Sequence, residues 1–110
     1  MLSPRMRKKL LQKILQKASE NKKYTFFSLL APEELTYKHC RILAELMDWD
    51  SNSVARLFAI ANFKATQSLS ISSEKKILDF LGYETMQKLE LMLLIETALD
   101  EIKNLLQSMK

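Results

Sequence analysis

The chain has 110 residues, enough for one domain, and 47% of them are apolar, so it can bury a core without disulfides or metal ions. One glycine and two prolines are too few for the many turns of a sheet protein, and one cysteine excludes an internal disulfide. The net charge of +4 is concentrated in residues 1–23, where eight Lys and Arg face one Glu (+7), while residues 24–110 carry nine against twelve acids (−3).

The first predicted helix covers residues 3–21. Ser3 can cap it, Pro4 suits its first turn, and apolar residues from Leu10 to Ala18 recur at helical spacing. The rest of its surface is basic, which is typical either of a solvated outer face or of a segment that binds nucleic acid, an acidic protein face or an anionic membrane. The basic residues are Arg5, Arg7, Lys8, Lys9, Lys13 and Lys17.

Residues 24–30, YTFFSLL, predict either a short helix capped by Thr25 or a buried connector. The next helix is expected to begin at Pro32, because two acidic residues follow this proline in the first turn. His39 lies near the apolar face of that helix and is expected to be partly buried and hydrogen-bonded, and Cys40 to be a small core residue. Since the chain has no other His or Cys, we expect neither a zinc site nor a cofactor.

The C-terminal third predicts two more helices. Ser72 or Ser73 can cap a short helix over 74–81, and Gly82, the only glycine, suits its left-handed C-terminal cap. A long helix over 84–108 carries apolar residues at 3-4-3-4-3 spacing, typical of a helix–helix interface. This wide stripe predicts either a position across the middle of a bundle or a dimer interface. Its residues are Met92, Ile95, Leu99, Ile102, Leu106 and Met109.

The stretch LAELMDWDSNSVARLF, residues 43–58, pairs two apolar runs around a polar turn. Ala44 is small where two helices would approach closely, Trp49 can anchor the turn, and Asp50 can cap the second helix through the N–H of Asn52 or Ser53. This pattern resembles the helix-turn-helix superfamily of DNA-binding proteins. Asp48 stands where that family usually has glycine, a position that Asp tolerates better than most residues.

The resemblance implies that the second helix enters the major groove of DNA. Asn and Arg suit contacts with adenine and guanine respectively. Residues 43–58 have a net charge of −2, however, so the electrostatic attraction to phosphate would have to come from the basic helix at 3–21. The residues implied in groove contact are Ser51, Asn52, Ser53 and Arg56.

The sequence therefore predicts an all-α fold, a compact bundle of about five helices with a long C-terminal helix, in one domain over 1–110, with residues 32–65 as a helix-turn-helix-like core. The most apolar run, Leu89–Leu99, is interrupted by Glu90 and Glu96, so we expect no membrane span and a soluble, cytoplasmic protein. The acid-free residues 1–19 would also fit a mitochondrial presequence, although such segments favour Arg and Ser over Lys.

Two functions compete on this basis. The first is a small dimeric DNA-binding protein, a transcriptional regulator. The second is a non-enzymatic helical adaptor or assembly subunit that binds another protein, for which the basic segment predicts an acidic partner. Membrane-surface binding by residues 3–21 is a third and weaker hypothesis, because that helix lacks Trp and Phe. An enzyme is not expected, because no spacing in the chain assembles a nucleophile, a base and an oxyanion donor.

Overall fold

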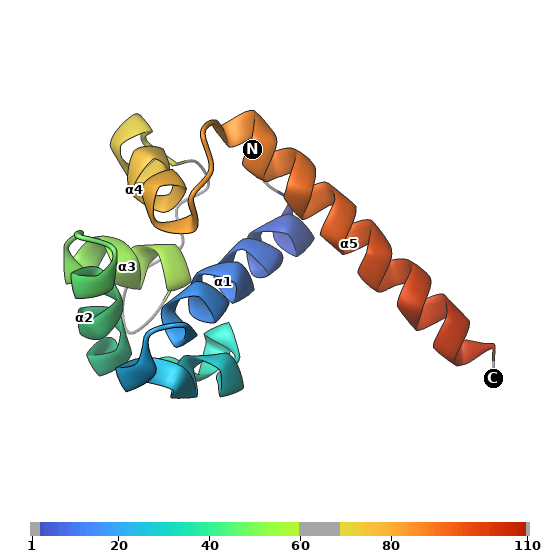
Figure 1. Cartoon of the computed structure of the whole chain (residues 1–110), viewed down its shortest axis with the longest axis horizontal. Coiled ribbons are helices and arrows are strands. Elements are labelled where there is room, and N and C mark those ends of the chain that lie inside the picture. The colour runs from blue at the N-terminus through green and yellow to red at the C-terminus, as the bar shows by residue number, and fades with distance from the viewer. Residues whose placement is uncertain (1–2, 60–68, 110) are drawn as a thin grey trace.

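The computed structural model describes residues 3–59 and 69–109, and every regular element in these two ranges is helical. This confirms the all-α class. Two short 3-10 helices accompany five α-helices (Figure 1). The elements are α1 (Pro4–Ser19), η1 (Lys22–Leu29), η2 (Pro32–Glu34), α2 (Tyr37–Leu46), α3 (Ser51–Phe58), α4 (Ile71–Leu81) and α5 (Met86–Ser108). The part of the predicted core at residues 60–65 lies outside the described residues.

Helix α1 lies at the centre of the molecule and contacts η1, η2, α4 and α5. As predicted, the Ser3 hydroxyl accepts a hydrogen bond from the Met6 N–H, and Pro4 occupies the first turn. The side chains of Leu10, Ile14 and Leu15 are buried in one continuous apolar cluster to which the other helices contribute. The helix ends at Ser19, two residues before the predicted end.

The segment between α1 and α2 differs from the prediction. Asn21, and not Thr25, caps η1, and its side-chain oxygen accepts from the Lys23 N–H. Pro32 begins only a single turn, because Leu35 adopts an extended backbone and is buried outside any helix. Helix α2 therefore begins at Tyr37.

The start of α2 uses His39 in a way that the sequence did not suggest. The Thr36 N–H donates to His39 Nδ1 at 2.9 Å, so this histidine satisfies a backbone donor at the helix N-terminus. The ring is half-buried, which confirms the expectation of a partly buried, hydrogen-bonded histidine. Cys40 is fully buried in the core, also as expected.

The two C-terminal helices begin at other residues than predicted. Ser70, and not Ser72 or Ser73, caps α4 by accepting from the Ser73 N–H, so that helix starts three residues earlier than expected. Gly82 ends it in the left-handed conformation, with φ +82°, as predicted. Thr85 then caps α5 by accepting from the Lys88 N–H.

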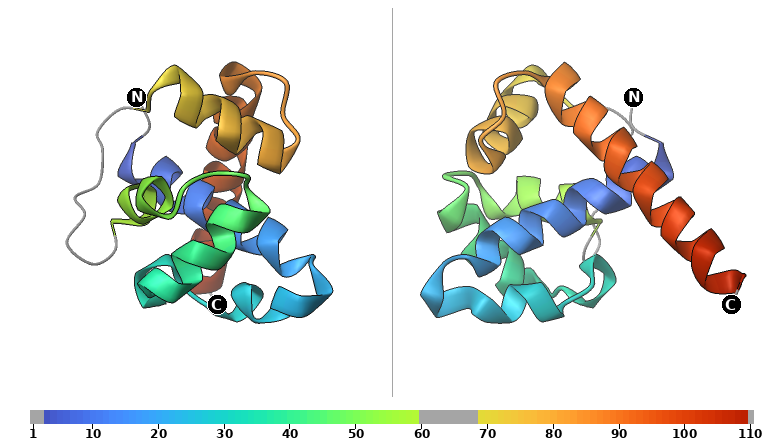
Figure 2. Two further views of the ribbon diagram at one scale, coloured as in Figure 1. Left: turned by 90° about the vertical axis from the view of Figure 1, so that its left-hand side faces the viewer. Right: turned by 45° about the vertical axis from the view of Figure 1, so that its right-hand side comes forward.

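Helix α5 begins beside α4 and α1 and then runs out of the body of the molecule (Figures 1 and 2). Every residue from Ala98 to Met109 is exposed. The molecule is correspondingly elongated, with principal extents of 44, 29 and 28 Å. Among the described residues, none of the helices combines the length and the apolar character needed to cross a bilayer.

Candidate functional site

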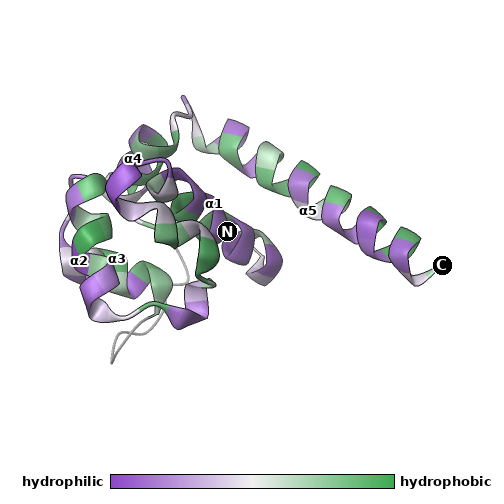
Figure 3. Ribbon diagram, turned by 60° about the horizontal axis from the view of Figure 1, so that its bottom comes forward, coloured by the Kyte–Doolittle hydropathy of each residue, from purple (hydrophilic) through white to green (hydrophobic). Residues whose placement is uncertain are grey.

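Helix α5 has an exposed apolar face. It consists of ten residues that lie on one side of the helix. At 100° per residue they span an arc of about 160°, and every residue of 91–109 that falls within this arc is apolar. All ten are exposed. Apolar residues recur along α5 up to its projecting end (Figure 3). The ten are Leu91, Met92, Leu94, Ile95, Ala98, Leu99, Ile102, Leu105, Leu106 and Met109.

This face includes all six residues of the apolar stripe that the sequence predicted. Met92 is 38% exposed and Ile95 is 44% exposed, Leu99, Ile102 and Leu106 are between 53% and 58% exposed, and Met109 is 81% exposed. The apolar stripe therefore does not cross the middle of its own bundle.

The opposite side of α5 packs against the rest of the molecule. Near its start, Leu89 and Leu93 are fully buried in the core. Farther along, the same side carries the acidic residues Glu96, Asp100 and Glu101, and these face the basic side of α1. Helix α5 thus turns a mostly polar side to the body and its apolar face to solvent, the reverse of the usual arrangement for a surface helix.

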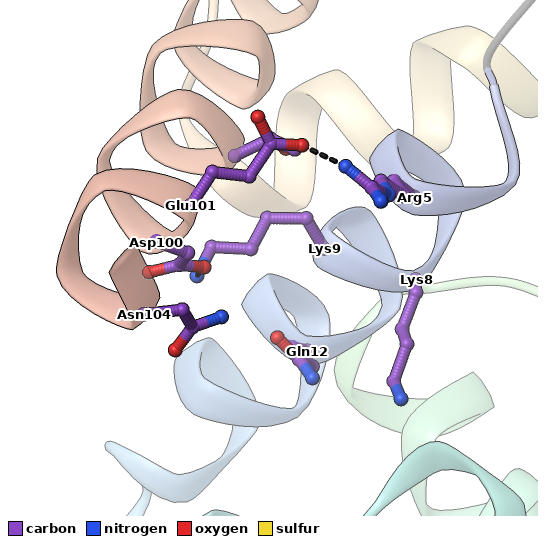
Figure 4. A pocket seen from close by; sticks show the side chains of 8 residues that line it. Arg5, Lys8, Lys9, Gln12, Asp100, Glu101 and Asn104 are labelled. Carbon is purple, nitrogen blue, oxygen red and sulfur yellow. Dashed lines mark hydrogen bonds and ion pairs between the residues drawn. The ribbon is translucent and has the colours of Figure 1, made fainter. Parts of the chain in front are cut away.

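Three ion pairs join α1 to α5. The Lys9 Nζ lies 2.7 Å from Asp100 Oδ2, and the Lys13 Nζ lies 2.7 Å from Glu96 Oε1. Arg5 pairs with Glu101. Two of these pairs, Lys9–Asp100 and Arg5–Glu101, line a groove of about 310 Å³ between the two helices. Within it Arg5 and Lys9 reach toward α5, while Lys8 points away from it (Figure 4).

The Lys13–Glu96 pair is the least exposed of the three, since the two side chains are 23% and 26% exposed. Partial burial by itself lowers the pKa of Lys13, but hydrogen bonds and charge attraction to Glu96 and Tyr83 outweigh it and raise the pKa above the ordinary value. Lys13 is therefore fully charged at neutral pH and is held between α5 and the Tyr83 ring, 5.8 Å from the ring centre.

The other three predicted phosphate-binding residues also have partners within the chain. Lys8 Nζ lies 3.8 Å from Glu33, and Lys17 Nζ lies 3.1 Å from Glu20. The Arg7 guanidinium donates to the Leu57 carbonyl at 2.9 Å, and burial lowers its pKa. The basic face of α1 is thus largely neutralised by the acidic body of the same molecule.

The turn between α2 and α3 is formed by residues 47–50. Ala44 is buried, and its carbonyl accepts from the Trp49 N–H at 2.9 Å. Asp48 adopts the left-handed conformation, with φ +51°, at the position that usually has glycine. Asp50 caps α3 by accepting from the Ser53 N–H at 2.9 Å. Hydrogen bonds from the Ser53 hydroxyl and N–H hold the pKa of Asp50 below its ordinary value.

The residues predicted to contact DNA bases are only partly available. Asn52 and Arg56 are exposed one turn apart on α3, whereas Ser51 and Ser53 are half-buried. The Asn52 side-chain oxygen accepts from the Tyr37 hydroxyl at 2.7 Å. Because a bidentate contact with adenine uses that same oxygen, Asn52 would have to exchange Tyr37 for the base.

The sequence reasoning missed the pairing between α1 and α5. A signal for it was present: Arg5, Lys9 and Lys13 recur every four residues along one helix, as do Glu96 and Asp100 along the other. Residues four apart lie on the same face of a helix, so two complementary rows could have been matched.

In the described residues, no three His, Cys, Asp or Glu side chains are grouped so that they could hold a metal ion. The chain matches no protein-family model, no curated protein and no solved structure at a significant level.

Proposed function

We propose that this chain is a non-enzymatic helical assembly protein that binds a protein partner through the apolar face of α5. The observation that carries the proposal is the reversed orientation of this helix. Monomeric proteins rarely expose a continuous apolar surface of this extent, and such surfaces mark interaction sites.

The exposed area is large enough to stabilise a complex. Nine large side chains on this face retain between 38% and 81% of their surface. Burying the rest of each contributes on the order of 1 kcal/mol, so the nine together contribute on the order of 9 kcal/mol, before the partner's own apolar surface is counted. Association costs about 4–15 kcal/mol, so a partner with a similar apolar face gives a net favourable binding energy.

The charges on α5 favour a protein over a membrane surface. Helices that lie on membranes usually carry Lys and Arg beside their apolar face. Here the polar side carries Glu96, Asp100 and Glu101, with Lys103 as the one basic residue between positions 91 and 109. The cationic border that draws a helix to an anionic bilayer is therefore missing from α5.

Site-specific photo-crosslinking tests this proposal in cells that make the protein. A photoreactive phenylalanine analogue replaces Leu99 on the apolar face, and the same analogue replaces Lys38, an exposed residue of α2, as the control. We expect protein adducts from position 99 and few from position 38. The proposal is contradicted if the analogue at position 99 gives no protein adduct. It is also contradicted if the purified chain stays monomeric and floats with lipid vesicles.

DNA binding is a second candidate function, and the geometry of the α2–α3 turn supports it. The left-handed Asp48, the Asp50 cap and the exposure of Asn52 and Arg56 on one face of α3 all suit a helix that enters a groove. The ion pairs of α1 count against it, since binding to phosphate would first have to release cations from their carboxylates.

A salt titration of binding to random duplex DNA tests this second candidate. Because α1 forms the centre of the core, deletion of residues 1–23 would unfold the protein, so single substitutions are used instead. Arg56→Ala should change sequence preference, whereas Lys8→Ala, on an exposed side chain, should weaken binding to all sequences alike. Binding that is absent at about 50 mM salt would rule out DNA as the partner.

A further inference from the structure

The proposed function leaves the partner of α5 unnamed. Resting on that function, we propose that the partner is a second copy of this chain, whose α5 packs antiparallel against the same face. The two copies then bury each other's apolar faces through one self-complementary interface, the commonest form of protein dimer.

The spacing of the large apolar residues is symmetric about the point between Asp100 and Glu101. In an antiparallel pair, each of these residues meets the one of the same spacing pattern that lies equally far on the other side of this point. The six positions at 3-4-3-4-3 spacing then form six apolar layers without a gap. The layers pair Met92 with Met109 of the second copy, Ile95 with Leu106 and Leu99 with Ile102, and each pair occurs twice.

The six residues at 3-4-3-4-3 spacing are flanked along the helix by two further rows, called borders here, and these rows favour the antiparallel direction over the parallel one. One border carries Glu96 and Lys103, and the other carries Leu91, Ala98 and Leu105. In antiparallel pairs each border meets its own counterpart, so Lys103 lies beside Glu96 of the second copy and Ala98 beside Leu105. In a parallel pair each charged border would instead meet the apolar one.

The body of each copy leaves room for this arrangement. Helix α1 contacts α5 outside the apolar face, through the three ion pairs. The projecting end of α5, in which all residues from Ala98 onward are exposed, would lie along the first half of α5 in the second copy. A carboxylate accepts from more than one donor, so Glu96 can bind Lys103 of the second copy and keep Lys13.

Disulfide trapping of the full-length chain tests the direction of the pair. The variants Met92→Cys and Met109→Cys, one of them carrying a size tag, are purified, mixed and mildly oxidised. The antiparallel arrangement places position 92 beside position 109 of the other copy and about 25 Å from position 92, so we expect the mixed product. Wild type is the matched control, because its only thiol, Cys40, is fully buried.

Sedimentation equilibrium from about 1 µM to about 1 mM measures the dimer itself. We expect Leu99→Glu to raise the dissociation constant by at least about 100-fold and Lys103→Glu to raise it about tenfold, because the latter places like charges together at two symmetric sites. Lys38→Glu makes the same change of charge on α2 and should leave the dissociation constant unchanged. Circular dichroism confirms that each variant is folded.

The possible failures are distinct. A chain that is monomeric at all concentrations, yet gives adducts with a different protein from position 99, overturns the second copy and leaves the proposed function standing. A monomeric chain that gives no protein adduct overturns both. A disulfide that joins position 92 of one copy to position 92 of the other overturns the antiparallel arrangement. So does a dissociation constant that Lys103→Glu leaves unchanged.

Discussion

The Lys13 ammonium lies 2.7 Å from the Glu96 carboxylate and joins the basic side of α1 to the acidic side of α5. The two residues are 83 positions apart in the chain, and neither side chain is more than about a quarter exposed. This contact explains the uneven charge of the sequence in part: the +7 segment and the acidic body neutralise each other within one molecule. It also fixes which side of α5 remains available to a partner.

The coupling between these two residues can be measured with a double-mutant cycle of Lys13→Met and Glu96→Gln. We expect a coupling free energy of about 1 kcal/mol, since the pair is mostly shielded from solvent. The control is the exposed pair of Lys88 and Glu84, which lie four residues apart in the sequence. Its expected coupling is about 0.3 kcal/mol. Urea unfolding at pH 7 gives both values, and equal couplings would contradict the prediction.

The same pair has a defined pH dependence. Because the folded protein raises the pKa of Lys13, the contribution is fully present below the ordinary value of 10.5 and is lost as the pH rises through the raised pKa. We expect the wild-type chain, but not Lys13→Met, to show this alkaline loss. Urea midpoints of both proteins, measured below and above pH 10.5, test this prediction.

Asp48 offers a test of the turn between α2 and α3. Its φ of +51° is strained for any residue with a Cβ atom, so Asp48→Gly should stabilise the protein by up to about 1 kcal/mol and Asp48→Val should destabilise it. The ion pair with Lys76 that glycine removes is worth little, because Asp48 is fully exposed. Thermal unfolding gives the free energies.

Gly82 provides the opposite substitution at a comparable backbone conformation. A Cβ atom added there would have no neighbour within 4 Å, so Gly82→Ala changes only the backbone strain of the φ +82° position. We expect a loss of about 1 kcal/mol. If neither Gly82→Ala nor Asp48→Gly changes the free energy of unfolding, then neither position is strained.

The Asp50 cap should make α3 sensitive to acid. The lowered pKa of this carboxylate means that its contribution is fully present above the ordinary value of 3.8 and is lost as the pH falls through the lowered pKa. Asp50→Ala should cost about 1 kcal/mol at pH 7, whereas Asp50→Asn should keep most of the cap without its pH dependence. Urea unfolding between about pH 2 and pH 7 distinguishes the three proteins.

The Cys40 thiol should be unreactive in the folded protein. Burial raises its pKa to about 11 and leaves the side chain fully covered. At pH 8 we expect a disulfide reagent to react at least about 100-fold more slowly than with an exposed thiol, and at the ordinary rate after denaturation. Leu29→Cys, at a position that is 83% exposed, supplies the exposed thiol for comparison. Fast labelling of Cys40 in the native protein would contradict its burial.

Much of the local structure could be predicted because it depends on neighbouring residues. Ser3 and Pro4 start α1, Gly82 ends α4 and Asp50 caps α3, as the sequence indicated. An error arose where a local signal competed with burial in the core. Pro32 and its acids indicated a helix start, but the chain extends at Leu35 to bury that side chain, and the helix begins after Thr36.

By itself, the amino-acid sequence determined the helical class, several helix ends and the ten-residue apolar face of α5, because caps and the 3.6-residue period act within a few residues along the chain. Only the tertiary structure decided which way that face points and what the basic residues of α1 contact. Both depend on contacts between α1 and α5 that join residues 83 to 96 positions apart in the chain. A hydrophobic pattern shows that a helix has two sides, but the side that meets its own core is chosen by the surfaces that fold against it.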